Sequence, residues 1–147
     1  MRLWHYKLIS YLPNSQLIAQ WRELNSIFKK QDKHILINYV YEYSKENLLF
    51  YTKLVLDEMI KRGYKNIHAD NYVKYFKDYI EIDRFSKNKA EIKIYLGIFD
   101  NPFPNHHTNR YLLQCFYNLQ EKYNRGQKDF SEKQYKILEE FVKNEIH

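Results

Sequence analysis

Apolar side chains near the start of the chain recur at spacings of four, three and four residues. These positions are Leu17, Trp21, Leu24 and Phe28. The spacing is typical of one face of an α-helix, in which about 3.6 residues make one turn. Pro13 precedes the run, and Asn14 and Ser15 are residue types that often begin helices. We therefore predict an amphipathic helix of about four turns that begins near Asn14.

A second helix is predicted to begin near Ser44 and to end at Lys61 and Arg62. Its apolar face consists of Leu48, Thr52, Val55, Leu56, Met59 and Ile60. Lys61 and Arg62 would lie at the negative end of the helix dipole, and Gly63 provides a left-handed cap. A shorter helix follows, which Asp70 would cap. It would bury Tyr72, Val73, Phe76 and Tyr79.

Two more helices are predicted near the end of the chain. Thr108 begins the first, which ends before Gly126. Its apolar positions are Tyr111, Leu112, Cys115, Phe116 and Leu119. Ser131, followed three residues later by Gln134, has the pattern of a capping box. The last helix continues through Tyr135, Leu138 and Val142.

The remaining segments show no helical period. Between about residues 81 and 107 the pattern weakens, and Pro102 and Pro104 indicate an irregular loop. The run Ile35 to Tyr43 has the β-branched and aromatic density of a strand, but one short run cannot make a sheet. The sequence therefore predicts an all-α fold. We expect a single compact domain of about four to five helices over residues 1–147.

The composition narrows the class of protein. Aromatic residues make up 18% of the chain, far more than in disordered proteins. Cys115 is the single cysteine, and the sequence has no Cys/His spacing typical of a zinc site. No apolar run approaches the roughly 18 residues of a membrane span. We expect a cytoplasmic protein without a membrane segment, metal or cofactor.

The charge points toward a polyanionic partner. Lys and Arg number 24 against 18 Asp and Glu, a net charge of +6. Such an excess attracts nucleic acid, since each cation placed on a phosphate releases counterions. A bias of the genome toward lysine explains the same number, because the chain is also rich in Asn, Ile and Tyr.

Arg22 and Glu23 lie on the first predicted helix but outside its apolar arc. Periodicity alone favours an ordinary solvated pair. The residues around them favour another interpretation, because several segments match one family of proteins.

Several positions of the N-terminal third fall at the intervals of one family: Tyr11-Leu12, Leu17, Arg22-Glu23-Leu24, Phe28 and Lys33-His34. By these positions the segment resembles the pyrimidine-dimer DNA glycosylase family, which is also called the endonuclease V family. Further on, the resemblance includes Lys61-Arg62-Gly63-Tyr64 and Phe103-Pro104 with His106. The opening Met1-Arg2-Leu3-Trp4-His5, with Leu8-Ile9 and Leu12-Pro13, is more similar to the cellular branch than to the phage branch.

The resemblance implies a DNA repair enzyme. Members remove one base of an ultraviolet-induced pyrimidine dimer and then cleave the backbone at the abasic site by β-elimination. The nucleophile is the α-amine of the chain, here that of Met1, or of Arg2 if Met1 is removed. An α-amine has an ordinary pKa of about 7.7–8.0 against about 10.4 for Lys, so more of it is neutral near pH 7. Glu23 matches the catalytic glutamate, which stabilises charge and transfers protons.

The resemblance also implies the DNA-binding residues and the partner. Arg22 matches an arginine that contacts DNA beside the lesion, and Arg2, Lys29, Lys30 and Lys33 are expected to contact phosphates. His34 matches a family position too, although a lone histidine also serves structural hydrogen bonds. The expected partner is double-stranded DNA with damaged bases or abasic sites, bound by a monomer without a cofactor.

Four departures from the family leave alternatives open. Arg2 replaces the threonine whose amine acts in the phage enzyme, Gln16 replaces an active-site histidine, and Ser26 replaces a helix arginine. The basic and aromatic tail of the phage enzyme has no recognisable counterpart. One alternative is a nonenzymatic DNA-binding protein that keeps the fold. Another is a different activity on nucleic acid that uses Glu23.

Overall fold

The computed structural model describes residues 2–31, 33–83, 91–94 and 99–147. It confirms the all-α class, with one small β-hairpin. The α-helices are α1 (Asn14–Lys30), α2 (Lys45–Lys61), α3 (Asp70–Tyr75), α4 (Asn109–Asn124) and α5 (Glu132–Ile146). The other elements are the 3-10 helices Tyr6–Tyr11 and Asn38–Glu42 and the strands β1 (Ile80–Asp83) and β2 (Glu91–Ile94). Within the described part of the chain, no helix is long and apolar enough to cross a membrane.

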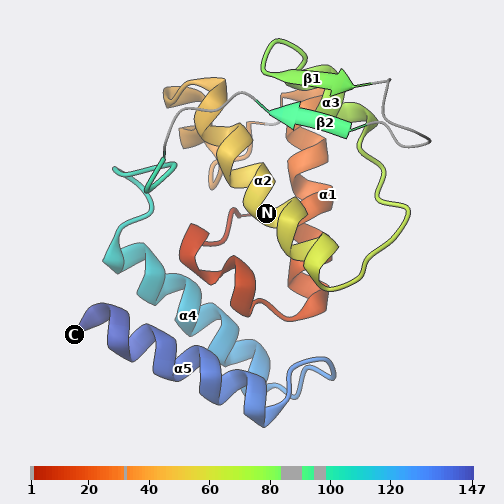
Figure 1. The fold of residues 1–147 in the computed structure, drawn as a ribbon. Coiled ribbons are helices and arrows are strands. Elements are labelled where there is room, and N and C mark those ends of the chain that lie inside the picture. The colour runs from red at the N-terminus through yellow and green to blue at the C-terminus, as the bar shows by residue number, and fades with distance from the viewer. Residues whose placement is uncertain (1, 32, 84–90, 95–98) are drawn as a thin grey trace.

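Helix α1 lies at the centre of the hydrophobic core. It packs against both α2 and α3, as Figure 1 shows. The predicted apolar face is buried, with Leu17 and Leu24 fully covered. Pro13 is the N-cap, and Gln31 ends the helix in the left-handed conformation, where its N–H binds the Ile27 carbonyl at 2.8 Å. The period of the sequence therefore placed this helix correctly, with its caps one residue beyond each end.

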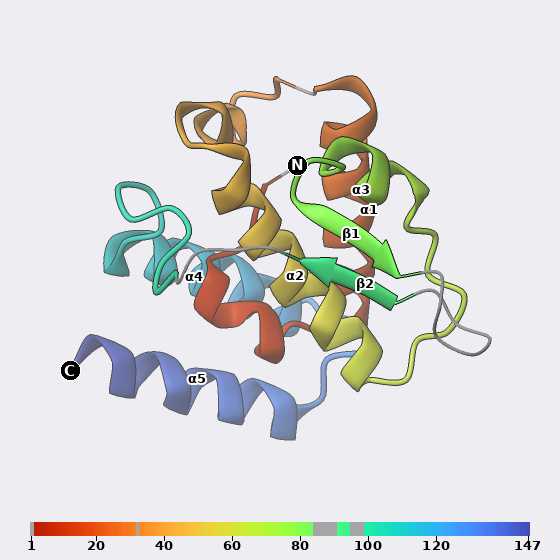
Figure 2. The ribbon, with the colours of Figure 1, turned by 45° about the horizontal axis from the view of Figure 1, so that its top comes forward.

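Helices α4 and α5 form an antiparallel pair at one end of the molecule, and the β-hairpin lies at the other end (Figures 1 and 2). Both predicted N-caps are present: Thr108 accepts a hydrogen bond from the Tyr111 N–H, and Ser131 forms the capping box with Gln134. Such caps satisfy N–H groups that have no partner within the helix. The sequence therefore predicted both helix starts.

The last 23 residues dock on the N-terminal part of the chain. The Asp129 carboxylate accepts hydrogen bonds from the backbone and hydroxyl of Ser15, at 2.8 and 2.6 Å. The Tyr11 ring stacks on Phe141, with 4.4 Å between centroids. The Asp129 carboxylate, placed beside Ser15, also interacts favourably with the positive N-terminal end of the α1 dipole. The C-terminal residues are therefore joined to the start of α1 by polar contacts and to the 3-10 helix Tyr6–Tyr11 by an apolar one.

The structure corrects four details of the sequence prediction. Residues 35–43 form a turn and a 3-10 helix instead of a strand. Part of the segment expected to be an irregular loop forms β1 and β2, which pair antiparallel with Ile80 opposite Ile94. Ala69, rather than Asp70, is the N-cap of α3. Ile60 is 58% exposed, because it lies away from the side of α2 that packs on α1.

Candidate active site

Residues 3–5 form neither helix nor strand and lie in the core. Leu3, Trp4 and His5 are buried, although no β-strand pairs with them among the described residues. Buried backbone groups need hydrogen-bond partners, and here side chains provide them. The Tyr51 hydroxyl donates to the Trp4 carbonyl at 2.6 Å, and the Tyr111 hydroxyl donates to the Leu3 carbonyl. Residues of α2 and α4 thus hold the N-terminal segment in one position.

Gln20 connects this segment to the carboxylate of Glu23. Its side chain is fully buried on α1, and its amide nitrogen donates to the Arg2 carbonyl and to the Glu23 carboxylate, both at 3.0 Å. Its amide oxygen accepts from the Trp4 N–H at 2.7 Å and lies 2.8 Å from the Tyr51 hydroxyl oxygen, whose single proton is shared between this oxygen and the Trp4 carbonyl. Both amide protons of Gln20 and its oxygen are thus used.

Two buried histidines hold the other end of the segment. The Lys7 N–H donates to His5 Nδ1 at 3.1 Å, so the His5 proton is assigned to Nε2, which donates to the His107 carbonyl at 3.1 Å. In the same way, His107 Nδ1 accepts from the Tyr6 N–H and Nε2 donates to the Tyr39 hydroxyl. Burial lowers the pKa of His5 to about 4 and that of His107 to about 2, so both rings are neutral.

Glu23 is half-buried at the wall of a pocket of about 290 Å³. Burial raises the pKa of its carboxyl, while the backbone N–H of Arg2 and the charge of Arg22 oppose that shift. Arg2, Leu36 and, from α4, Lys122 line the same pocket. A carboxylate whose pKa is raised in a pocket can exchange a proton with a bound substrate at mildly acidic to neutral pH.

Met1, whose amine the sequence analysis assigns to catalysis, lies outside the described residues. Arg2 is described, and its guanidinium carbon lies 5.9 Å from the centroid of the Trp4 ring. The structure therefore brings two predicted site residues, Arg2 and Glu23, to one pocket.

Arg22 is exposed and lines a second pocket, of about 500 Å³, between α1 and α3. Trp21, Asn25 and, from the loop before α3, His68 also line it. Arg22 follows Gln20 and precedes Glu23 on the same turn of α1, so the two pockets lie on adjacent faces of one helix.

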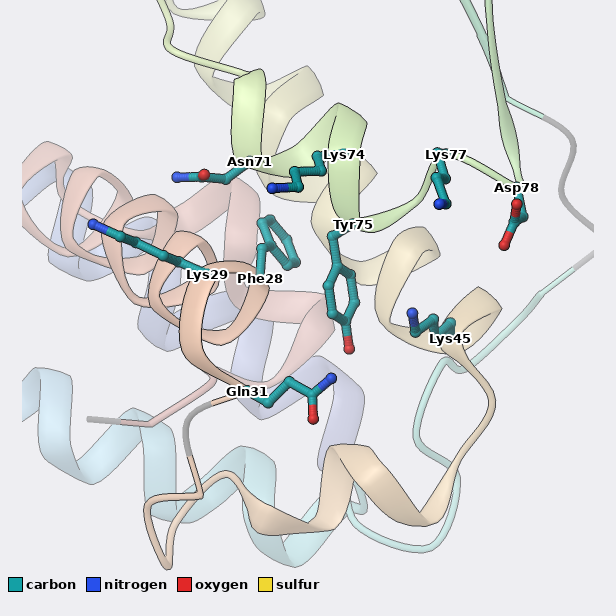
Figure 3. Close-up of a pocket in the computed structure, with 9 residues that line it drawn as sticks. All are labelled: Phe28, Lys29, Gln31, Lys45, Asn71, Lys74, Tyr75, Lys77 and Asp78. Atoms are coloured by element: carbon teal, nitrogen blue, oxygen red, sulfur yellow. The ribbon is translucent and has the colours of Figure 1, made fainter.

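Lys29 belongs to a third pocket, of about 280 Å³, which four lysines line: Lys29, Lys45, Lys74 and Lys77. In Figure 3 they surround the rings of Phe28 and Tyr75. None of the four pairs with a carboxylate of a described residue. Asn71 lines both this lysine pocket and the Arg22 pocket, so the two are adjacent.

Lys30, Lys33 and His34 are exposed and line none of these three pockets. His34 has a structural role in its turn: its Nδ1 accepts from the Leu36 N–H at 3.2 Å, and its carbonyl accepts from the Ile37 N–H at 2.9 Å. Within the described ranges, no three His, Cys, Asp or Glu side chains are placed to bind a metal ion.

The sequence analysis missed Gln20, Tyr51, His107 and Tyr111 as residues of the site. Only Gln20 had a signal in the sequence. It lies three residues after Leu17 and four before Leu24, so it occupies a core position of the helix with a polar side chain. A polar residue at such a position needs hydrogen-bond partners, and this requirement could have marked it.

Comparison with known proteins gives one match. A family model described as pyrimidine dimer DNA glycosylase matches residues 1–72. The matched range contains Arg2, Gln20, Arg22, Glu23 and Tyr51. Neither the curated proteins nor the solved structures gave a match.

Proposed function

Because this chain belongs, through residues 1–72, to the pyrimidine dimer DNA glycosylase family, we propose that it removes a base from damaged duplex DNA and then cleaves the backbone at the abasic site. One observation carries the proposal: Gln20 binds both the Arg2 carbonyl and the Glu23 carboxylate, so the first residues of the chain are held against Glu23. The substrate is DNA with pyrimidine dimers.

The α-amine of the first residue is the nucleophile in this proposal. Three covalent bonds separate the nitrogen of a residue from the nitrogen of the next, so the amine preceding Arg2 can be no farther than about 4 Å from the Arg2 nitrogen. The Arg2 backbone lies beside Glu23, because the Gln20 amide binds both the Arg2 carbonyl and the Glu23 carboxylate. An α-amine, with an ordinary pKa of about 7.7–8.0, is partly neutral near pH 7 and can attack a carbon atom.

The reaction proceeds in two stages. The amine forms a bond to C1′ of the damaged nucleotide while the bond between C1′ and the base breaks, and the base leaves with a proton. Ring opening then gives an imine between the amine and C1′. Removal of a proton from C2′ expels the 3′ phosphate, and water finally releases the amine. Glu23 carries the protons, and its charge stabilises the cation that develops at C1′.

The cations of the N-terminal half bind the duplex. Residues 1–80 contain 13 Lys and Arg against 8 Asp and Glu, so most of the excess positive charge lies there. Arg22 would contact a phosphate beside the lesion, and Arg2, Lys30, Lys33 and His34 would contact the flanking backbone. The lysine pocket, which includes Lys29, is next to the Arg22 pocket and extends this basic surface along α1 and α3.

A borohydride trapping experiment tests the proposal. The protein is incubated with abasic duplex DNA and sodium borohydride, which reduces an imine to a stable covalent adduct. We expect an adduct with the native protein and none with protein acetylated at its α-amine. Glu23→Gln should prevent cleavage while duplex binding persists. Duplex binding without an adduct would instead favour the second candidate, a DNA-binding protein without catalytic activity, which the bulky Arg2 side chain in the pocket favours.

A further inference from the structure

Two large apolar side chains stand exposed at the edge of the Glu23 pocket. Ile35 is 83% exposed, more than any other large hydrophobic residue that the structure describes, and its neighbour Leu36 is 46% exposed. Single exposed apolar residues are common on protein surfaces, but two adjacent ones beside a reactive pocket call for a reason. Leu36 lines the pocket together with Glu23 and Arg2, so the pair belongs to the surface that a substrate would meet.

The turn that carries the pair is held in shape from both sides. His34 closes it, because its ring accepts from the Leu36 N–H and its carbonyl accepts from the backbone of Ile37 and Asn38. Ile37, the next residue, is fully buried and anchors the turn in the core. Hydrogen bonds within the turn and the buried side chain of Ile37 thus keep Ile35 and Leu36 exposed to water, where apolar side chains are unfavourable.

The charges around the turn indicate what covers these side chains. Lys33 and His34 precede the pair, and Lys29 and Lys30 end the helix before it. Duplex DNA fits both features, because its phosphates would meet the cations while its stacked bases offer an apolar interior that side chains can enter.

We propose that Ile35 and Leu36 form a wedge that enters the base stack of duplex DNA at the lesion and opens the stack beside Glu23. The inference rests on the proposed function and deepens it. Proteins that bend DNA often insert Ile or Leu between base steps, and the inserted side chain replaces the lost stacking contact. Extrusion of a nucleotide requires such unstacking. Leu36 belongs both to the exposed pair and to the wall of the Glu23 pocket, so the wedge adjoins the site of reaction.

The test uses a dimer-containing duplex with 2-aminopurine opposite the lesion, since this base becomes fluorescent when it leaves the stack. The variant is Ile35→Ser with Leu36→Ser. The matched control is Ile137→Ser on α5, which is 48% exposed in the parent protein and does not line the pocket. Both changes remove exposed apolar surface, so circular dichroism should show the native helix content in each.

We expect the double variant to bind undamaged duplex as the parent does, to lose most of the fluorescence increase, and to excise about 10 to 100 times more slowly, since unstacking costs a few kcal/mol per step. A duplex mismatched at the lesion is already unstacked and should restore the rate. Parent-like fluorescence and excision in the double variant would overturn the wedge, and so would an equal loss on the mismatched duplex. Failure of the parent protein to excise at all would overturn the proposed function instead.

Discussion

The region around α1 and the α4–α5 pair differ in net charge and in how their charged side chains are paired. Residues 1–80 carry an excess of five positive charges, whereas residues 99–147 contain 7 Lys and Arg against 7 Asp and Glu. On the C-terminal pair, Arg125 binds Glu121 at 2.6 Å and Glu145 binds Lys7 at 2.7 Å. The four lysines of the lysine pocket have no carboxylate partner among the described residues.

The two regions also differ in what their buried polar groups do. On α4 and α5 the predicted caps satisfy the helix ends locally. Around α1, a buried glutamine and two buried histidines hold the N-terminal segment against a half-buried carboxylate. Local hydrogen bonds stabilise a helix, whereas long-range ones fix a geometry. We infer that the α1 region is organised for a DNA partner and a reaction, and that the α4–α5 pair supports it.

Among the variants that distinguish the two regions, Glu23→Gln should have the largest effect, a loss of excision rate. Loss of a group that transfers protons typically lowers a rate by about 10² to 10⁴-fold. Excision of dimers, measured by gel assay, should fall by that factor while the Kd for duplex DNA changes little. In the parent protein, the acid limb of the rate should lie above the ordinary carboxyl pKa of 4.5, because burial raises the pKa of Glu23. The matched change Glu121→Gln on α4 should leave the excision rate unchanged. An equal loss of rate in this variant would contradict the assignment of catalysis to the α1 region.

The next effect is a loss of stability in acid. Because folding lowers the pKa of His5 and His107, the unfolded chain binds protons below about pH 6.5 that the folded protein does not. The contribution of the two neutral histidines to the free energy of unfolding is fully present above pH 6.5. It is lost as the pH falls toward 4, by about 1.4 kcal/mol per pH unit for each histidine. Urea unfolding at pH 7, 6 and 5 measures this slope. His107→Gln should make the slope shallower, and the exposed control His68→Gln should not.

A smaller loss is expected from Gln20→Met, which keeps the size of the side chain but removes its hydrogen bonds. The Arg2 carbonyl and the Trp4 N–H lose a partner, whereas the Tyr51 hydroxyl keeps the Trp4 carbonyl, so the free energy of unfolding should fall by about 3 kcal/mol. The exposed Gln114→Met on α4 is the control and should change it by less than about 0.5 kcal/mol. A loss below about 1 kcal/mol for Gln20→Met would mean that the N-terminal segment does not depend on this amide.

The smallest effect concerns single surface charges. Lys74→Gln removes an unpaired cation from the lysine pocket and should reduce the slope of log Kobs against log salt by about 0.9 for duplex DNA. Arg125→Gln removes a cation that already has a carboxylate partner and should leave the slope unchanged. Fluorescence anisotropy at several salt concentrations measures both. Equal slopes for the two variants would contradict the division of charge between the regions.

The sequence predicted the helices well because their information is local. The spacing of Leu17 and Leu24 and the caps at Thr108 and Ser131 act within a few residues of one another. The β-hairpin was missed although residues 80–83 and 91–94 alternate apolar and polar types, since two runs of four residues, separated by seven others in the sequence, give too weak a signal. The 3-10 helix at residues 38–42 was taken for strand-like sequence because β-branched and aromatic residues are common in strands, although here only Val40 of the five is buried.

The site was predictable only where a resemblance supplied it. Arg22 and Glu23 came from the matched family positions, since periodicity alone indicated a solvated pair. The partners that hold Glu23 could not be predicted, because Gln20 and Tyr51 meet across 31 residues and Tyr111 reaches the Leu3 carbonyl across 108. Contacts between such distant positions depend on tertiary packing, which no local pattern records.

The central claim is that the first amine of the chain reacts beside Glu23, and the most direct test is to map the trapped adduct. The borohydride-reduced complex with abasic DNA would be digested and its peptides identified by mass spectrometry. We predict that the sugar remnant is attached to the α-amine of Met1, or of Arg2 if Met1 is removed. Lys122 lines the same pocket and carries the other amine that could react there. An adduct on Lys122, with a free N-terminus, would contradict the account.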